Sequence, residues 1–497
     1  MAIPFLQSVL VFVISLLFIR LVFWRIWFYR NLPPGPPAWP IVGNLLQLRF
    51  SDGGFERSVK KFHKKYGPIF TVWFASRPIL VIATRDLAHE ALIQKGSVFA
   101  DRPPARGLRK MLTSNQHSIN SAAYGPLWRS LRRNLVSEAL YPSAMKAFGE
   151  VREWGIGRLV ENLRTEAARN GGAVSVVEQF RTAVLCILLC MCFGSKPDEE
   201  TVISVQGVMR EILLSGGGLD DALAIPGFFL RRRRARIAEI RRRQRETLLR
   251  LINKRRDAQP PSVGAYVDTL LNMTVDGGRT LDDDELVTLC SEFLTAGTDT
   301  TTTSLQWLMA NLVIRQDVQA RLYDEIVGIT GRGKPVEEDD LQRMPYLEAA
   351  VKETLRRHPP GHFVLPHAVT RPCELAGYEV PANASINFYV AGMGMDPGVW
   401  QNPSEFRPER FMDEGVEVDL TGTKEIKMMP FGAGRRVCPG LGMAVLHLNL
   451  IVARLVQEFT WECKPGETVD LSETQEFTTV MKYPLQAVIK DREMGHK

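Results

Sequence analysis

Apolar residues along the chain recur mostly at the spacing of helices, and a few short runs have the character of strands. Helical periodicity is clearest in three segments, residues 85–96, 305–328 and 346–358. Residues 67–84 predict two short strands joined by a turn at 75–78, because β-branched and aromatic residues flank turn-forming ones. Short extended segments are also predicted at 373–381 and 384–390. The pattern therefore predicts one large, mainly α-helical domain with a minor β part.

The N-terminus is almost continuously apolar from residue 3 to residue 30, interrupted only by Arg20 and Arg25. A helix of about 20 such residues spans the hydrocarbon core of a bilayer. No Lys or Arg precedes Arg20, so the positive flank is C-terminal and is expected to stay in the cytosol. A cleaved signal peptide would have a charged start and a small-residue cleavage site, and neither is present. We therefore predict an uncleaved membrane anchor at residues 1–30.

A stiff hinge is predicted at residues 31–44, which hold five prolines and two glycines, and a catalytic domain at 45–497. The chain has 497 residues, 45% of them hydrophobic, which is enough for a large core. Its seven cysteines are an odd number without tight pairing, so we expect a reducing compartment and no disulfide framework.

Positive charge is concentrated in one segment. The net charge is +7, but residues 231–256 hold thirteen Lys and Arg against two Glu, so the rest of the chain carries −4. Nucleic-acid binding therefore receives little support. Because an apolar patch at 222–230 precedes the arginines, we interpret 222–246 as an element that lies on the membrane surface. A solvated helix face is the alternative.

Two motif-like segments have structural interpretations. Gly328, Gly333 and Lys334 fit the spacing of a phosphate-binding loop, but Pro335 replaces the Ser or Thr that would bind magnesium, and acidic residues follow. We interpret this segment as a helix end and a loop. The three cysteines within residues 185–194 have no histidine nearby and are expected to be buried in an apolar helix: Cys186, Cys190 and Cys192.

A long apolar helix is predicted around residues 293–307, with an unusual centre. Gly297 and five threonines surround Asp299 there, and both residue types lower helix propensity. Threonine hydroxyls can bond to the carbonyl four residues earlier and bend the helix, so an acid and hydroxyls at this point could relay protons. The alternative is a threonine-rich helix face without chemistry.

Two charged pairs look ordinary when each is taken alone. Glu353 and Arg356 stand three residues apart on one predicted helix face, a spacing typical of a salt bridge. Glu409 and Arg410 form a second acid–base pair within the loop "FRPERF". An exposed pair of this kind contributes little to stability.

Four segments taken together, in their order along the chain, are more specific than any one of them alone. The segments "AGTDTT", "ETLR", "FRPERF" and "FGAGRRVCPG" resemble the cytochrome P-450 superfamily, the haem-thiolate monooxygenases. The last motif matches F-x-x-G-x-R-x-C-x-G at each fixed position: Phe431, Gly434, Arg436, Cys438 and Gly440. The resemblance covers essentially the whole chain and implies the helical fold of that superfamily around haem b, after an N-terminal transmembrane helix.

The resemblance implies that Cys438 is the thiolate ligand of the haem iron. Its glycines would let backbone N–H groups approach the sulfur, and the helix after it would add a positive dipole. A catalytic nucleophile would instead need an exposed thiol with a histidine beside it. That reading leaves the arginines and the threonine-rich helix unexplained.

Other roles carried over from the resemblance fall into five groups. Haem-binding positions that supply cations and donors for the propionates are Arg102, Trp128, Arg132, His367 and Arg436, and Phe431 belongs to the cysteine loop. Ala296 and Gly297 would lie against the distal face of the haem, and Asp299 with Thr300 would deliver protons. The structural network would be Glu353, Arg356 and Arg410.

The reaction implied is insertion of one oxygen atom of O2 into a C–H or C=C bond, with NADPH electrons arriving through NADPH–cytochrome reductase. Cytochrome b5 would be an optional second donor, and the location implied is the endoplasmic reticulum membrane, single-pass, with the catalytic domain in the cytosol. A reductase-independent haem isomerase or dehydratase would disturb the acid–threonine pair, which is intact here. A non-enzymatic membrane-anchored binding protein is the remaining alternative.

Sequence details resemble the plant microsomal branch, and within it the groups that oxidise fatty acids in-chain for cutin and a sister group linked to chlorophyll breakdown. Other plant lipophiles, such as phenylpropanoids or terpenoids, are the alternative substrates. The pocket-lining stretches implied are 102–122, 359–366 and 476–480, which are largely apolar. His117 and His362 are expected to be solvent-facing loop histidines, although either could hold a polar end of the substrate.

Overall fold

The structure is a computed structural model that describes residues 12, 15–16, 31–39, 42–49, 54–75, 77–105, 107–215, 230–258, 264–275, 277–413 and 418–492. Almost all of the predicted anchor, and residues 222–229 of the segment interpreted as lying on the membrane, are outside these residues. The chain divides into two compact units. The first contains residues 1–103 and 366–388, and the second contains 104–365 and 389–497.

A four-stranded sheet organises the first unit, in the order β1-β2-β9-β6. Its strands are β1 (Ile69–Phe74), β2 (Arg77–Ile82), β9 (Ser385–Phe388) and β6 (His367–Ala368). The predicted hairpin at 67–84 is confirmed, with β1 antiparallel to β2 and Ala75 at φ 57° in the turn. β2 runs parallel to β9, which brings residue 80 opposite residue 386.

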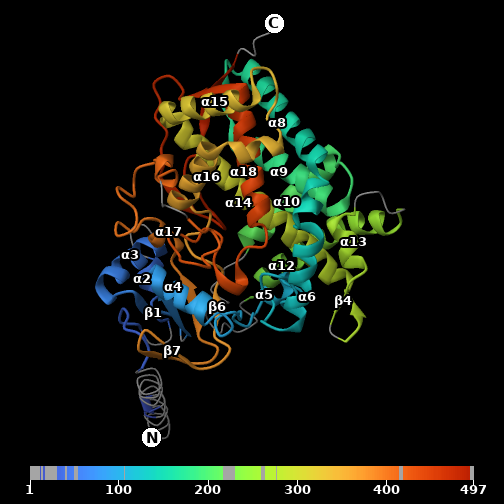
Figure 1. Ribbon diagram of the computed structural model, residues 1–497. Helices are drawn as coiled ribbons and strands as arrows, with labels where there is room; N and C mark the ends of the chain where they lie inside the picture. The colour runs from blue at the N-terminus through green and yellow to red at the C-terminus, as the bar shows by residue number, and fades with distance from the viewer. Residues whose placement is uncertain are drawn as a thin grey trace, which may run out of the picture. The chain divides into compact units, whose positions relative to one another are not determined.

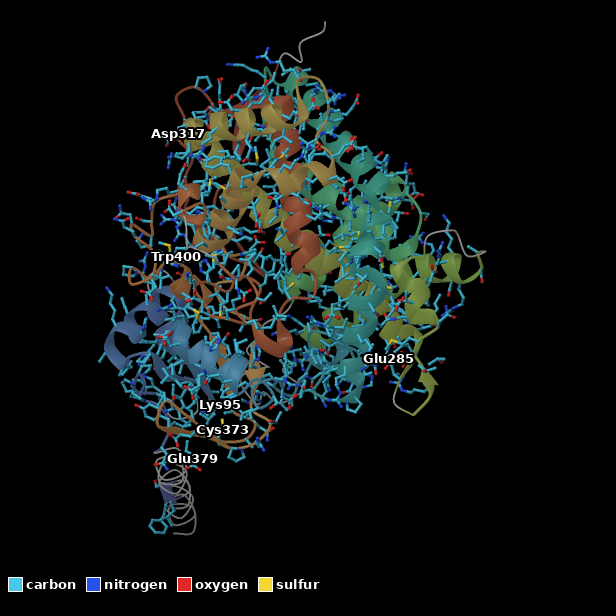
Figure 2. The ribbon with its side chains drawn as sticks, in the orientation of Figure 1. Lys95, Glu285, Asp317, Cys373, Glu379 and Trp400 are labelled. Carbon is cyan, nitrogen blue, oxygen red and sulfur yellow. The ribbon has the colours of Figure 1, made fainter. Side chains whose placement is uncertain are left out.

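The remaining elements of the first unit are short. The helices among its described residues from 31 onward are α2 (Leu45–Arg49), α3 (Gly54–Tyr66) and α4 (Arg85–His89), and α4 continues as a π-helical turn (Glu90–Gln94). The predicted extended segment at 373–381 is a hairpin of β7 (Cys373–Leu375) and β8 (Tyr378–Val380). Lys95 lies beside Cys373 (Figure 2), and its Nζ donates to the carbonyl oxygen of Glu374 at 2.6 Å.

Helices make up most of the second unit, with α14 (Asp283–Ile314) among them (Figure 1). The helices that pack on α14 include α9 (Val176–Phe193), α12 (Arg231–Arg256), α16 (Pro345–Arg357) and α18 (Leu441–Glu458). Further α-helices of the described residues are α5 (Arg109–Leu112), α6 (Pro126–Asn134) with a π turn (Leu135–Ala139), α7 (Pro142–Lys146), α8 (Gly149–Arg169), α10 (Glu199–Ser215), α13 (Tyr266–Leu271), α15 (Gln316–Thr330) and α17 (Val390–Gly394). Short 3-10 helices lie at Glu338–Arg343, Pro408–Phe411 and Gly434–Arg436.

Small sheets complete the second unit. One has the order β10-β13-β3, with β10 (Phe459–Glu462), β13 (Gln486–Asp491) and β3 (Ala173–Ser175). Two hairpins are formed by β11 (Glu473–Gln475) with β12 (Thr479–Met481), and by β4 (Thr274–Val275) with β5 (Arg279–Thr280). The mainly α-helical fold with a minor β part is confirmed.

The core of the second unit includes two helices that are mostly apolar and mostly buried. Among the described residues, α9 and α18 are long and apolar enough to cross a membrane, but 78% and 72% of their residues are buried within the protein. Both are therefore core helices, because most of their apolar surface is covered by the protein. Cys186, Cys190 and Cys192 are buried in α9 without disulfides, as predicted.

Helix α14 begins with a reciprocal cap between Asp282 and Glu285, in which each backbone N–H bonds to the other side chain. It continues unbroken through the glycine and threonines that were expected to weaken it, because packing against its neighbours outweighs their low propensity. The predicted helical run 305–328 is wrong at Arg315, where φ −102° and ψ 79° separate α14 from α15. The rejected phosphate-loop segment is indeed a helix end, with Gly331 at φ 77°.

Candidate active site

The cysteine loop folds tightly before α18. Gly432 and Gly434 have φ values of 69° and 70°, a left-handed conformation that favours glycine. The backbone N–H of Cys438 donates to the carbonyl oxygen of Phe431 at 2.8 Å, which closes the loop. Cys438 is a free, half-buried cysteine, and α18 begins three residues after it at Leu441.

Three local features act on the Cys438 thiol. Burial raises its pKa, whereas the backbone N–H of Gly440 and the positive charge of Arg132 oppose that rise. Arg132 is held nearby because its Nη2 donates to the carbonyl oxygen of Val437 at 2.7 Å. A backbone donor to sulfur, a guanidinium and a helix N-terminus all favour a thiolate, which is the form that binds metal.

Arg436 and Trp128 form a second part of this environment. The Arg436 guanidinium lies 4.3 Å from the centre of the Trp128 ring and donates to the carbonyl oxygens of Ile119 and Ala122, at 3.1 and 2.6 Å. The indole N–H of Trp128 also donates to Ile119, at 3.1 Å. These contacts connect the loop before α6 with the cysteine loop.

The other two predicted propionate partners belong to the first unit. Arg102 donates from Nη1 to the carbonyl oxygen of Pro366 at 2.8 Å, and Nδ1 of His367 lies 2.6 Å from the carbonyl oxygen of Phe99. These two residues therefore lie close together on neighbouring segments. The structure thus places the predicted set in two groups, one in each unit.

A partly exposed surface interrupts the buried length of α14. Residues 285–291 and 301–313 are buried, whereas Ala296 is exposed and Gly297 and Thr300 are half-buried. Met443 lies between α14 and the cysteine loop, because its Cε is 3.6 Å from the position that a Cβ would take on Gly297 and 3.8 Å from that on Gly440. Leu188 of α9 also fills the position on Gly297, at 2.7 Å. An accessible surface of small residues near a free thiol and guanidinium groups fits a planar anionic group such as haem.

Asp299 points away from that surface. Its Oδ1 accepts from Arg181 Nη1 at 3.0 Å, and its Oδ2 accepts from Thr478 Oγ1 at 3.1 Å. Thr300, the adjacent residue, donates its hydroxyl to the carbonyl oxygen of Ala296 at 2.6 Å. Residues one apart on a helix point in different directions, so the acid and the alcohol have separate surroundings.

Sequence reasoning did not identify Arg181 or assign a role to Thr478. The available signal for Arg181 was an arginine near the start of a mostly apolar helix, since a buried arginine requires a partner. Thr478 lies in a stretch already predicted to line the pocket.

The predicted structural residues form one buried network. Arg356 donates to both carboxylate oxygens of Glu353, at 2.7 and 2.9 Å, and Arg410 Nε donates to Glu353 Oε1 at 3.0 Å. Pairing of Glu409 with Arg410 is not what the structure shows. Glu409 instead bonds to Arg321 and to the hydroxyl of Tyr346, because Arg410 turns inward to Glu353.

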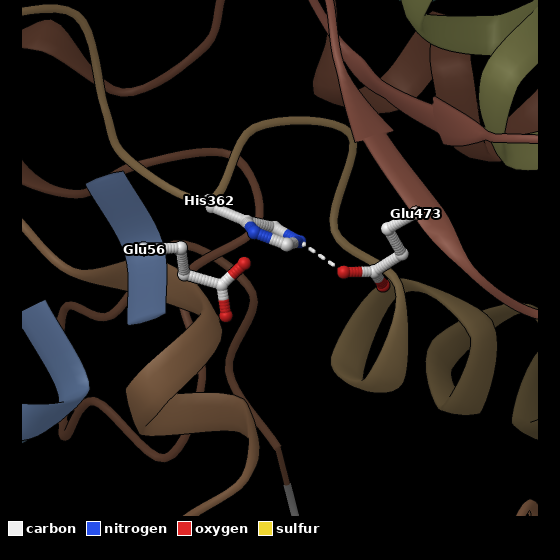
Figure 3. Close-up of side chains that lie close together, drawn as sticks. All are labelled: Glu56, His362 and Glu473. Atoms are coloured by element: carbon white, nitrogen blue, oxygen red, sulfur yellow. Dashed lines mark ion pairs between the residues drawn. The ribbon is translucent and has the colours of Figure 1, made fainter. Parts of the chain in front are cut away.

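The sequence led us to expect that both loop histidines face the solvent, but neither does so fully. His362 is buried at 3% exposure, and its Nε2 lies 3.6 Å from Glu473 Oε2 (Figure 3). The prediction is wrong here because the β11–β12 hairpin covers the loop. His117 is half-buried, and its Nδ1 lies 2.6 Å from Glu285 Oε1.

Comparison with known proteins gives a consistent result. A family model described as cytochrome P450 matches residues 33–490. Cytochrome P450 89A9 of Arabidopsis thaliana is 42% identical over 96% of each chain, and isoflavone 3'-hydroxylase of Medicago truncatula is 32% identical over 93% of each. A zebrafish cytochrome P450 solved with abiraterone has the same fold, with a TM-score of 0.74 at 23% identity over 88% of this chain and 100% of its own.

Proposed function

The chain belongs to the cytochrome P450 family, and on that premise we propose which residues perform its monooxygenase chemistry. The protein is a haem monooxygenase of the plant cytochrome P450 type, and it takes electrons from a redox partner. When bound, the haem supplies the centre at which O2 is reduced and split, so that one oxygen atom enters the substrate and the other leaves as water.

We assign Cys438 as the axial thiolate. One observation carries this assignment: Met443 lies against both Gly440, beside the free thiol, and Gly297, on the exposed part of α14. Arg132, Arg436 and Trp128 of the second unit are the proposed propionate partners. For Arg102 and His367, which belong to the first unit, the same role stays a prediction from the resemblance. The division into an anchor at 1–30, a hinge at 31–44 and a catalytic domain at 45–497 stays a prediction.

Asp299 and Thr300 are assigned to proton delivery. Asp299 is a buried carboxylate whose hydrogen bonds come from Arg181 and Thr478, whereas Thr300 lies on the half-buried surface near Ala296. An acid and a hydroxyl on successive residues are groups that general acid catalysis can use. Because the two side chains point in different directions, a proton passing between them requires a water molecule or a rotation of Asp299.

Replacing Thr300 with Ala should uncouple electron use from product formation. Coupled turnover converts substrate R–H, O2, NADPH and one proton into R–OH, water and NADP⁺. Without the hydroxyl, NADPH, O2 and a proton should instead yield NADP⁺ and H2O2. We expect product per NADPH to fall on the order of tenfold. The measurement is NADPH, peroxide and product in one assay, with Thr300→Ser as the variant that keeps the hydroxyl; unchanged coupling in Thr300→Ala would remove Thr300 from proton delivery.

The substrate is a lipophilic small molecule. Within the predicted pocket lining, Leu365 is 43% exposed and Phe477 is 46% exposed, so apolar side chains are available for contact. In-chain oxidation of a long-chain fatty acid is one candidate. The 32% identity to an isoflavone 3'-hydroxylase favours a second candidate, a plant phenolic. Terpenoids and chlorophyll catabolites are further candidate substrates. Microsomes with reductase and NADPH, given C12–C18 fatty acids beside these compounds, would separate the classes.

The location proposed is the endoplasmic reticulum membrane, with one span and the catalytic domain in the cytosol. Asn272 and Asn383 stand in N-glycosylation patterns and are both exposed, so a lumenal domain would carry glycans on them. We expect no endoglycosidase-sensitive change in mass for the wild-type chain. An acceptor site added before residue 3 should be glycosylated and serves as the control. A mass shift in the wild-type chain would contradict the orientation.

A further inference from the structure

The Asp299 carboxylate is held on two sides by elements far apart in sequence. Arg181 on α9 binds Oδ1, and Thr478, which lies between β11 and β12, binds Oδ2. All three side chains are buried. The sequence placed Thr478 only in a stretch predicted to line the substrate pocket, so its contact with the acid was not expected.

The direction of the hydrogen bonds follows from the chemistry. An ionised carboxylate only accepts, so the Thr478 hydroxyl must donate to Asp299. The Thr303 hydroxyl lies 2.9 Å from that of Thr478, and it must therefore be the donor in that pair. Thr303 and Asp299 lie four residues apart on the same side of α14, and Thr478 lies between them. The hydroxyl of Thr478 is consequently fixed in orientation.

The position of the Thr478 hydroxyl is fixed as well. The indole N–H of Trp307, one turn further along α14, donates to the carbonyl oxygen of Thr479 at 2.9 Å. The backbone N–H of Thr479 donates to the carbonyl oxygen of Pro360 at 2.8 Å. The segment carrying Thr478 is thus bonded to α14 and to the loop after α16, and its hydroxyl has little freedom to leave Asp299.

A small cavity lies on the Arg181 side of the carboxylate. Its volume is about 10 Å³, and Arg181, Thr295, Thr298 and Asp299 are among the residues that line it. Within the described part of the chain, the hydroxyls of Thr295 and Thr298 are buried without a hydrogen-bond partner. Apolar side chains such as Leu185 and Met209 line the cavity beside these polar groups, and its volume is at the lower limit for one water molecule. A water molecule in this cavity would lie next to Asp299 and the two unpaired hydroxyls.

We propose that Thr478 is a positioning residue that keeps one oxygen of Asp299 from pairing with Arg181. This rests on the proposed role of Asp299 in proton delivery. A guanidinium that binds both oxygens of a carboxylate holds it ionised and fixed. With Thr478 on Oδ2, Arg181 binds a single oxygen, and the carboxyl group can still take a proton from the cavity and release it toward Thr300. Proton supply therefore depends on the position of the hairpin.

The test is Thr478→Val, which has nearly the same shape and lacks the hydroxyl. We expect normal haem incorporation and normal substrate affinity by spectral titration. Product per NADPH should fall on the order of tenfold, with a matching rise in peroxide and in the solvent isotope effect. Thr478→Ser should restore coupling. Thr474→Val makes the same change on the exposed part of the hairpin and should behave as wild type.

A second substitution separates positioning from simple disruption. In the Thr478→Val background, Arg181→Gln should recover part of the coupling, because no guanidinium remains to take both oxygens. If Thr478→Val does not assemble with haem, Thr478→Ala carries the same expectations. Wild-type coupling in Thr478→Val, or no recovery on adding Arg181→Gln, would overturn the proposal. Asp299→Asn distinguishes a failure of the role of Asp299 from a failure of the role of Thr478. If Asp299→Asn stays coupled, the proposed role of Asp299 fails. If Asp299→Asn uncouples while Thr478→Val does not, only the role of Thr478 fails.

Discussion

Replacing Cys438 with Ser should abolish monooxygenation and remove the absorption band that a thiolate ligand gives the reduced carbonyl complex. A serine hydroxyl at this position does not supply the electron donation that assists O–O cleavage. The surrounding loop should survive, because its closing bond is made by backbone atoms of Cys438 and Phe431. We therefore expect folded protein that either binds haem without the thiolate band or does not retain it, and no detectable product.

The chain offers a control for this substitution. Cys463 is also a free cysteine of intermediate exposure, and it lies outside the cysteine loop. Cys463→Ser makes the same chemical change and should leave the carbonyl spectrum and the activity unaltered. A thiolate band that persists in Cys438→Ser would mean that another cysteine is the ligand, and the assignments around Cys438 would then be wrong.

The sequence predicted those parts of the site whose residues lie close together in the chain. Phe431, Gly434, Arg436 and Cys438 occupy one loop, and glycine at positive φ is a property that a short motif can encode. Glu353 and Arg356 are three residues apart on a helix, so their pairing follows from helix geometry. In both cases, local backbone conformation alone brings the groups together.

The partners of Asp299 could not be predicted in this way. Arg181 is 118 residues from it and Thr478 is 179 residues from it, so only tertiary packing brings them together. The burial of His362 has the same origin, because Glu473 reaches it from a distant hairpin. Arg315 is the opposite case: apolar periodicity continues past it, and the helix nevertheless ends there, because periodicity does not record where the chain changes direction.

The largest loss of stability is expected from Glu353→Gln, because this side chain carries the negative charge of a network with two arginines. Glu353 is fully buried, and its carboxylate accepts from Arg356, Arg410 and the backbone N–H of Arg407. Glutamine keeps the shape of glutamate but not its charge. Two buried guanidinium groups would then share no counter-charge among the residues described here.

The remaining contacts of Arg356 and Arg410 cannot replace the negative charge of Glu353. Arg356 also donates to the carbonyl oxygens of Gly394 and Pro403, and it lies 5.4 Å from the ring of Trp400, which is labelled in Figure 2. Arg410 also donates to the carbonyl oxygen of Gln401. Carbonyl dipoles and an aromatic ring carry no net charge, so they do not act as a counter-ion. Removing one partner of a buried ion pair costs ~3–5 kcal/mol. A loss of that size is a large fraction of the ~5–15 kcal/mol that stabilises a typical domain.

We therefore expect Glu353→Gln to lower the free energy of unfolding by about 3–5 kcal/mol and to reduce the yield of haem-loaded protein sharply. Denaturant titration of the holoprotein and the amplitude of its carbonyl spectrum measure the two effects. Glu348→Gln is the matched control on the same helix, since Glu348 is 52% exposed and pairs with Lys352 at 2.7 Å. An exposed pair contributes at most ~1 kcal/mol, so this variant should remain close to wild type. If the two variants lose equal stability, the buried network is no more important than a surface pair, and its assignment as the support of the haem-binding core must be abandoned.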